Sequence, residues 1–347
     1  MLHFRQLIGS IVFAYLLQMG ISTSLFAMDD SDLTGGTPFQ ILTHIPLELH
    51  PDQIQTSDPK APFELQIFRL NHGTLEHVVG LPIKISHLAA NSVRLEAVLK
   101  NSHFEINHGS DPYKIVADVP SIGKSQLIFQ SDSPGGQALG IWQIAHRAKN
   151  KLETEIGLGF WNSTLTFLWP EEADYYSFGQ VHISRGDHWD VVGHEMGHAI
   201  YDMGGLGTFG GGMHKIDECY SEELALSEGW ASFFSGWVSV DLNDADAKFE
   251  YMVPRRAPIR FETIPANVCL GERNEWRVTG FFWDLIDLHD DGEKSQESFA
   301  RIWKALEGSQ VSSTLAARTR LEQSGLDRFA LQIVWDLNFG ASSPSSL

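Results

Sequence analysis

The sequence predicts an α+β fold in which a small β-rich domain precedes a domain built from a small sheet and a helical lobe. Runs with a period of two fill residues 61–134, and helical periodicity begins after Gly135-Gly136. The remainder, from Asp187 to about Gly340, is mostly helical, with Gly- and Pro-containing breaks. A chain of 347 residues, 43% of them apolar, is long enough for both domains.

The first residues predict export. Arg5 precedes an apolar stretch over residues 7–21, and Leu25-Phe26-Ala27 stands before acidic residues, so residues 1–27 are typical of a signal peptide. Cleavage would leave a secreted or periplasmic protein with no stable membrane association, whereas an uncleaved segment would act as a membrane anchor. Residues 28–60 are rich in proline and are predicted to be a linker or arm.

The predicted elements follow in order along the chain. Alternating runs in the β-rich domain predict strands at 63–68, 81–85, 93–99, 113–119 and 126–129, which would form a small antiparallel sheet or sandwich. The second domain, residues 135–347, begins with a helix whose apolar face runs from Leu139 to Leu152. Two strands at 164–169 and 179–184 come next, and helices complete the domain.

The net charge restricts the possible binding partners, and the number of cysteines bears on the compartment in which the protein folds. Asp plus Glu number 44 against 25 for Lys plus Arg, a net charge of -19, which excludes nucleic acid as a partner because such a surface repels phosphates. The two cysteines, Cys219 and Cys269, most simply form a disulfide in an exported chain. Closing a loop of about 50 residues would stabilise the fold by roughly 4 kcal/mol.

A metal-binding pattern stands at the start of the helical lobe. His194-Glu195-Met196-Gly197-His198 is an H-E-x-x-H sequence in a predicted helix that Asp187 would cap, with Asp190 three residues on, and that Gly204-Gly205 would end. The two histidines lie one turn apart and can share one zinc ion. Glu195 lies about 100° around the axis, where its carboxylate can accept a proton from the attacking water.

A catalytic zinc needs a third protein ligand, and two residues compete for that role. Glu228 lies in the middle of a predicted helix over residues 221–240 with apolar neighbours, where a carboxylate is costly unless it is paired or bound to metal. His214, in a glycine-rich loop, is the competing ligand or a hydrogen-bond donor to the transition state. The structural alternative for Glu228 is an ion pair with Arg277.

The chain here resembles a known family. The H-E-x-x-H sequence followed by Glu228-Gly229-Trp230 and Ser232-Phe233-Phe234 resembles the gluzincin metallopeptidases, most closely the fungalysin-like branch, and residues 275–287 are similar to a later helix of that family. The resemblance implies a zincin-like catalytic domain and a thermolysin-like mechanism with zinc on His194, His198 and Glu228. This sequence departs by having Ala231-Ser232 where the family has Ser-Asp, so a carboxylate behind the site is missing.

These observations together predict an exported zinc metallopeptidase that hydrolyses protein or peptide substrates, as an endopeptidase rather than an exopeptidase, with Glu195 as general base. The candidate oxyanion donors are His214, Tyr201, Tyr220 and Arg277. Asp202, one turn after His198, is a candidate to orient an imidazole. The alternatives are a secreted binding module with an idle zincin fold and a zinc amidase acting on cell-wall material.

Overall fold

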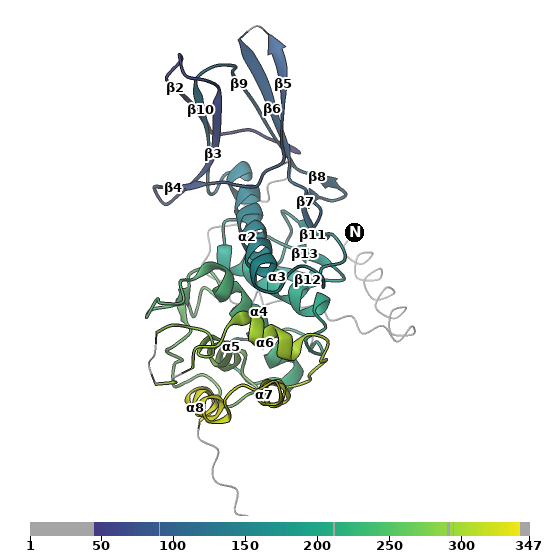
Figure 1. Ribbon diagram of the computed structural model, residues 1–347, viewed down its shortest axis with the longest axis vertical. Helices are drawn as coiled ribbons and strands as arrows, with labels where there is room; N and C mark the ends of the chain where they lie inside the picture. Colours follow the sequence, from purple (N-terminus) through teal and green to yellow (C-terminus); the bar gives the residue numbers. More distant parts are fainter. Residues whose placement is uncertain (1–44, 90, 211, 290–291, 294, 341–347) are drawn as a thin grey trace, which may run out of the picture.

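The computed structural model describes residues 45–340, except 90, 211, 290–291 and 294. The predicted signal peptide and the predicted linker as far as residue 44 lie outside the described residues. The molecule is elongated, with two sheets at one end, helix α2 (Pro134–Glu155) running toward the middle and a helical lobe at the other end (Figure 1). This order agrees with the predicted α+β class.

Two four-stranded sheets form the β-rich end. The first has the order β1-β9-β6-β5 and contains Glu48–Leu49, Lys114–Pro120, Ser92–Val98 and Ile83–Ala89. The second has the order β2-β10-β3-β4 and contains Gln53–Ser57, Lys124–Gln130, Glu64–Asn71 and Thr74–His77. All five predicted strands are present, but β10 pairs with β3 in parallel, and β1 with β9, so the sheets are mixed and not purely antiparallel.

Part of the predicted linker forms a β-strand. Strand β2 lies within residues 28–60 and pairs with β10 in antiparallel register. All five of its residues are exposed, so its sequence QIQTS has no apolar alternation that could have revealed it. Its stability comes from backbone pairing at a sheet edge, which leaves little trace in side-chain pattern.

A third sheet joins the two parts of the chain. Its order is β12-β13-β11-β7-β8, from Tyr175–Ser177, Gln180–His182, Leu165–Leu168, Phe104–His108 and Asp111–Pro112. Strands β11 and β13 match the predicted strands, and β11 pairs in parallel with both β13 and β7. One continuous sheet therefore contains residues from both sides of position 134, where the sequence divides the β-rich domain from the second domain.

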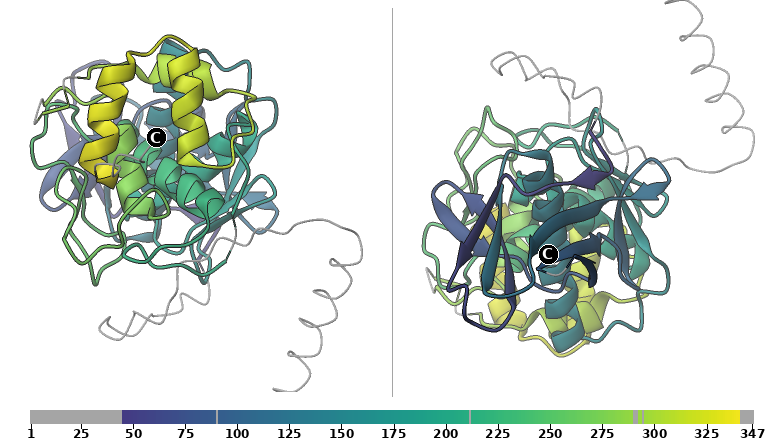
Figure 2. Two further views of the ribbon diagram at one scale, coloured as in Figure 1. Left: turned by 90° about the horizontal axis from the view of Figure 1, so that it is seen from below. Right: turned by 90° about the horizontal axis from the view of Figure 1, so that it is seen from above.

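Seen from below, the C-terminal helices, in yellow, cover the outer end of the helical lobe (Figure 2, left). Its helices are α3 (Trp189–Met203), α4 (Glu222–Ser239), α5 (Glu275–Trp283), α6 (Phe299–Leu306), α7 (Thr314–Gln323) and α8 (Arg328–Phe339), with a short β14–β15 hairpin of Lys248–Phe249 and Ile259–Arg260. Helix α2 contacts α3 and α4 of this lobe and also β3, β7 and β10. Its buried Trp142 and Leu139 belong to a core that runs through both parts of the molecule.

The start of α3 differs from the prediction. The N-cap position is His188, which makes no capping hydrogen bond, and Asp187 pairs instead with Arg185 at 2.7 Å. Asp190, fully buried, accepts hydrogen bonds from the backbone N–H groups of residues 250–252 at 2.7–3.1 Å. Asp190 thus anchors a distant loop through Oδ2, while its Oδ1 atom accepts from the N–H of Val191 in the first helical turn.

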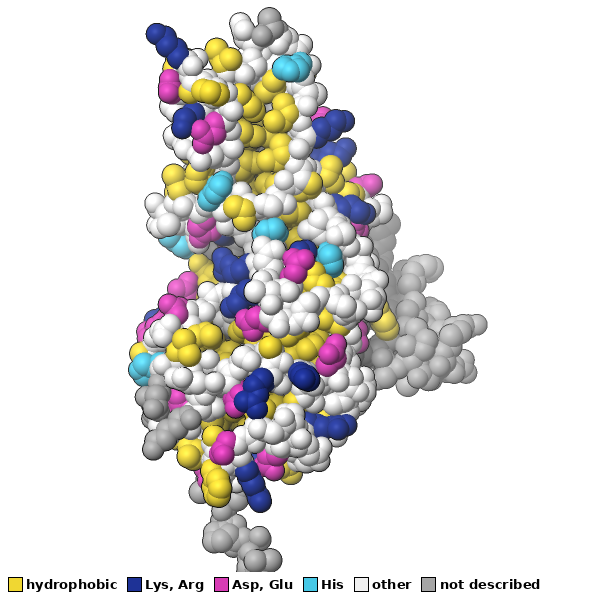
Figure 3. Space-filling view, in the orientation of Figure 1, with side chains coloured by type: hydrophobic (Ala, Val, Ile, Leu, Met, Phe, Trp, Pro, Cys, Tyr) yellow, Lys and Arg dark blue, Asp and Glu magenta, His cyan; other side chains and the backbone are white. Residues whose placement is uncertain are grey.

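The outer strand of the first sheet exposes much of its apolar surface. All seven residues of β5 are exposed, including Ile83, Ile85 and Leu88 at 41–49%. Figure 3 shows hydrophobic side chains gathered between the two upper sheets. Among the helices of the described residues, none combines the length and apolarity that a membrane span requires.

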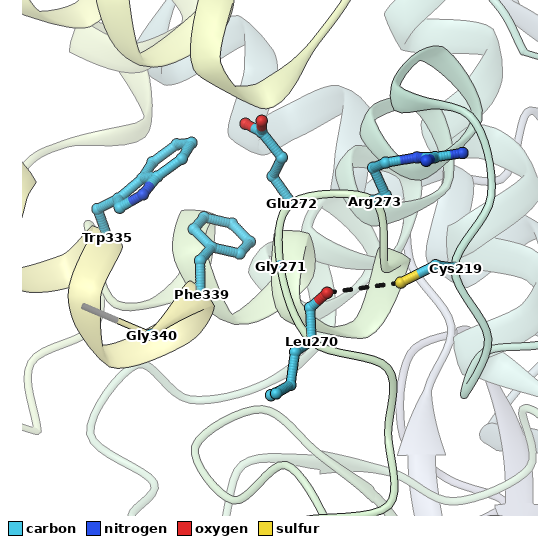
Figure 4. A pocket seen from close by; sticks show the side chains of 8 residues that line it. All are labelled: Cys219, Leu270, Gly271, Glu272, Arg273, Trp335, Phe339 and Gly340. Carbon is cyan, nitrogen blue, oxygen red and sulfur yellow. Dashed lines mark hydrogen bonds between the residues drawn. The ribbon is translucent and has the colours of Figure 1, made fainter. Parts of the chain in front are cut away.

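The predicted disulfide is confirmed. Cys219 and Cys269 are bridged with a Cα–Cα distance of 5.6 Å, and the bridge joins the loop before α4 to the loop before α5. A pocket of about 500 Å³ lies beside it, between that second loop and α8, with Glu272, Trp335 and Phe339 in its lining (Figure 4). The bridge therefore restrains the ends of both helices that follow it.

Reducing the Cys219–Cys269 bridge is expected to lower the free energy of unfolding by about 4 kcal/mol, because the bridge closes a loop of 50 residues in the unfolded chain. Thermal unfolding of the oxidised protein and of a Cys219→Ser/Cys269→Ser variant measures the change. Titration of the unreduced, unfolded protein should find no free thiol. Equal melting temperatures for the two forms would contradict the expectation.

Candidate metal centre

Helices α3 and α4 approach each other closely at two glycines. A Cβ placed on Gly197 would lie 2.8 Å from the Cα and the carbonyl oxygen of Ala231, and one on Gly193 would lie 2.4 Å from Ser235 Oγ. Because real Cβ atoms do not tolerate such contacts, the helices can pack at this distance only with glycine on α3. The apolar stripe of α3, with Val192 and Met196, faces the core as predicted.

The close approach brings together the three residues predicted to bind zinc. His194 Nε2 lies 3.1 Å from Glu228 Oε2 and 3.1 Å from His198 Nε2, and His198 Nε2 lies 3.2 Å from Glu228 Oε2. All three side chains are buried, with Glu228 and His198 at 0% exposure. Three ligand atoms on one small triangle form a compact, water-excluded group that can hold one metal ion.

Hydroxyl groups of α4 lie behind the two imidazoles. Ser232 Oγ lies 3.1 Å from His194 Nδ1, and Ser227 Oγ lies 3.4 Å from His198 Nδ1. Ser232 is the residue that replaces the aspartate of the fungalysin pattern, so a neutral hydroxyl stands where that pattern has a carboxylate. Asp202 accepts a hydrogen bond from Tyr176 at 2.6 Å, a role that differs from the one suggested by its position after His198.

Glu195 lies beside this triangle in an environment that opposes its ionisation. Its side chain is 3% exposed, and its Oε2 atom has no hydrogen-bond partner. Burial raises the pKa of Glu195 well above its usual value, and the charges of Glu228 and Asp174 raise it further, against a hydrogen bond from the backbone N–H of Tyr176 on the edge strand β12. A carboxylate held in this way accepts a proton readily.

The charges of the ligand residues depend on one another. Burial opposes the ionisation of Glu228, but the charges of His198 and His214 and hydrogen bonds from both helical histidines keep its pKa well below the usual value. Burial lowers the pKa of His194 to about 4, so its imidazole is neutral at physiological pH. Neutral imidazoles and an ionised carboxylate are the forms that bind zinc.

A second group of residues adjoins Glu228, and the sequence identified only part of it. His214 Nε2 lies 3.5 Å from Glu228 Oε2 and 3.1 Å from Oε2 of Glu275, the first residue of α5. Burial lowers the pKa of His214, but the two carboxylates raise it to about 9. Glu275 was not predicted, because an acid in the first turn of a helix is common for electrostatic reasons alone.

Three other candidate oxyanion donors make structural contacts. Arg277 donates to the carbonyl oxygens of Val268, Cys269 and Asn338, and so makes no pair with Glu228. Tyr201 donates to the carbonyl of Thr208 at 3.4 Å, and the hydroxyl of Tyr220 bonds Glu218 and the backbone of residue 215. Of the four candidates, His214 is therefore the one whose ring faces the carboxylates of the site.

Two histidines one helical turn apart and a glutamate from a second helix are a ligand set typical of zinc hydrolases. The comparison with protein families agrees with that class. Residues 159–332, half of the chain, match the mycolysin C-terminal domain, and the chain therefore belongs to this family, which supports a relationship to the zinc metallopeptidases. No curated protein matches the chain.

Replacing Gly197 by alanine is expected to separate α3 from α4 at the ligand triangle. Overpacking against the α4 backbone should lower the free energy of unfolding by about 1–3 kcal/mol, and displacement of Glu228 should weaken zinc binding about tenfold. Denaturant unfolding and zinc titration measure the two effects. The matched control is Gly159→Ala, since a Cβ at Gly159 meets no atom within 4 Å; equal effects of both changes would contradict the packing argument.

Proposed function

We propose that the protein is an exported zinc metallopeptidase in which His194, His198 and Glu228 hold the metal and Glu195 is the general base. The observation that carries the proposal is the buried triangle of His194, His198 and Glu228, with ligand atoms 3.1–3.2 Å apart. Family membership supports the peptidase class.

The residues fit a zinc ion on structural grounds. Ligand atoms placed tetrahedrally at about 2.0–2.1 Å from zinc lie about 3.3–3.4 Å from one another, close to the observed separations. Glu228 Oε1 is buried without a hydrogen-bond partner, which is costly unless a cation or water satisfies it. The Nδ1 atoms of both histidines face hydroxyl groups, so their Nε2 atoms are directed at the common point.

Each residue of the chain then has a separate task in peptide hydrolysis. A bound zinc ion would supply Lewis acidity toward the scissile carbonyl and lower the pKa of water at the site. Glu195 would accept a proton from the attacking water and transfer it to the leaving amine, and its raised pKa suits a group that must also act as an acid.

Export and substrate class follow from the same proposal. The Cys219–Cys269 bridge is typical of proteins that fold in an oxidising compartment, which agrees with a secreted or periplasmic location. The substrate would be a protein or peptide, cleaved by an endopeptidase, with no role for nucleic acid.

Glu195→Gln and Glu228→Gln should separate the base from the ligand. Glutamine at 195 keeps the size of the side chain but cannot accept the proton, so turnover should fall about a hundredfold or more while zinc content stays near that of the parent. Glutamine at 228 removes an anionic ligand, so zinc affinity should fall and part of the activity should return at raised zinc concentration. Elemental analysis and cleavage of an unfolded protein measure both variants.

Two outcomes would contradict these roles. If Glu195→Gln retains full turnover, Glu195 is not the base. If Glu228→Gln binds zinc as tightly as the parent while His214→Ala loses it, the third ligand is His214 and the gluzincin arrangement is wrong.

Removing the metal with a chelator should abolish cleavage of the unfolded protein, and adding zinc should restore it. The disulfide still joins the loops before α4 and α5 during this treatment, so recovery should not require refolding. A chelated preparation, shown by elemental analysis to be free of metal, that still cleaves at full rate would exclude a metallopeptidase.

A further inference from the structure

The second group of residues, His214, Glu228 and Glu275, has the composition of a metal site. The three side chains come from different parts of the lobe: the loop between α3 and α4, the middle of α4 and the first turn of α5. Their exposure is 4%, 0% and 7%, and the ligand atoms lie within 4.8 Å of one another. Three chain segments thus converge on a point that solvent does not reach.

The orientation of His214 leaves its second nitrogen without a hydrogen bond. Its Nδ1 atom lies 3.3 Å from the carbonyl oxygen of Gly212, an acceptor, and must therefore carry a hydrogen. In the neutral ring, Nε2 then presents a lone pair to the carboxylate oxygens of Glu275 and Glu228 at 3.1 and 3.5 Å. Neither contact has hydrogen-bond geometry, and Nε2 has no other partner among the described residues.

Two buried carboxylates, those of Glu228 and Glu275, face the His214 ring, and such a pair needs a positive charge beside it. Glu195 adds a further buried carboxylate near Glu228. A protonated His214 would supply positive charge without a metal, whereas a divalent ion bound by the neutral ring would supply it in place of that proton.

We propose that His214, Glu228 and Glu275 form a second divalent-metal site, which shares Glu228 with the first. An imidazole nitrogen and two carboxylate oxygens are a ligand set that suits zinc and leaves a position for water. Glu228 belongs to both groups because its Oε2 atom lies 3.1–3.2 Å from the two helical histidines and 3.5 Å from His214, while its Oε1 atom is buried without a hydrogen-bond partner. The inference rests on the proposed function only through Glu228 and concerns metal content, not peptide cleavage.

The test is the zinc stoichiometry of the full chain. Metal-free protein is titrated with zinc to saturation, and bound zinc is counted by elemental analysis after removal of free metal. The wild type should bind two equivalents, and Glu275→Gln and His214→Ala should each lose the same one. Glu272→Gln, a glutamate three residues from Glu275 that is not part of this group, is the matched control and should bind two.

The result for the wild type does not depend on how well any variant folds. Saturation at one equivalent would overturn the second site and leave the first intact; His214 would then be an imidazolium that bridges two carboxylates. Two equivalents retained in both Glu275→Gln and His214→Ala would also overturn it. Absence of any bound zinc in the wild type would overturn the proposed function as well, which distinguishes the two failures.

Discussion

The site depends on how closely α3 can approach α4. Gly193 and Gly197, one turn apart, remove the side chains that would hold the helices apart, and the backbone of α4 occupies the space. Glu228 reaches two imidazoles on the neighbouring helix only at this separation. A third glycine continues the arrangement, because a Cβ on Gly229 would lie 2.5 Å from Val278 of α5. The spacing of the three helices is thus set by contacts of glycine with the backbone at Ala231 and with the short side chains of Ser235 and Val278.

The close packing of α3 against α4 also brings several ionisable side chains together. Glu195, Glu228 and Glu275 are all nearly fully buried, and the imidazoles of His194, His198 and His214 lie among them. A protein interior stabilises such a group only when positive charge balances the carboxylates. The pKa values of Glu195 and Glu228 are displaced in opposite directions by this environment. Two carboxylates whose pKa values differ in this way can have different roles in one reaction.

Sequence reasoning succeeded where a residue's role follows from local spacing and failed where it depends on distant contacts. The separation of His194 and His198 by one helical turn, and the isolation of Glu228 in an apolar helix, were visible in the sequence. The disulfide followed from there being two cysteines in a chain that the sequence predicts to be exported. Glu275 gave no such signal, because its partner His214 is 61 residues earlier.

Two other features were missed because they depend on distant backbone contacts. Asp190 looked like part of a helix cap, yet it binds the backbone of residues 250–252. Strand β2 lacked apolar alternation, so only its pairing with β10 defines it.

The sheet β12-β13-β11-β7-β8 includes strands that lie outside the segment matched to the mycolysin C-terminal domain, so that segment lacks part of its own sheet. The segment that matches the mycolysin C-terminal domain starts at residue 159, whereas β7 and β8 end by residue 112 and α2 by residue 155. A fragment limited to the matched segment would leave β11 with an unpaired edge along its β7 side. It would also uncover the faces of α3 and α4 that α2 buries. A fragment that keeps the helical lobe together with this whole sheet must therefore begin before Phe104, inside the β-rich region, because the two regions share one sheet and one core.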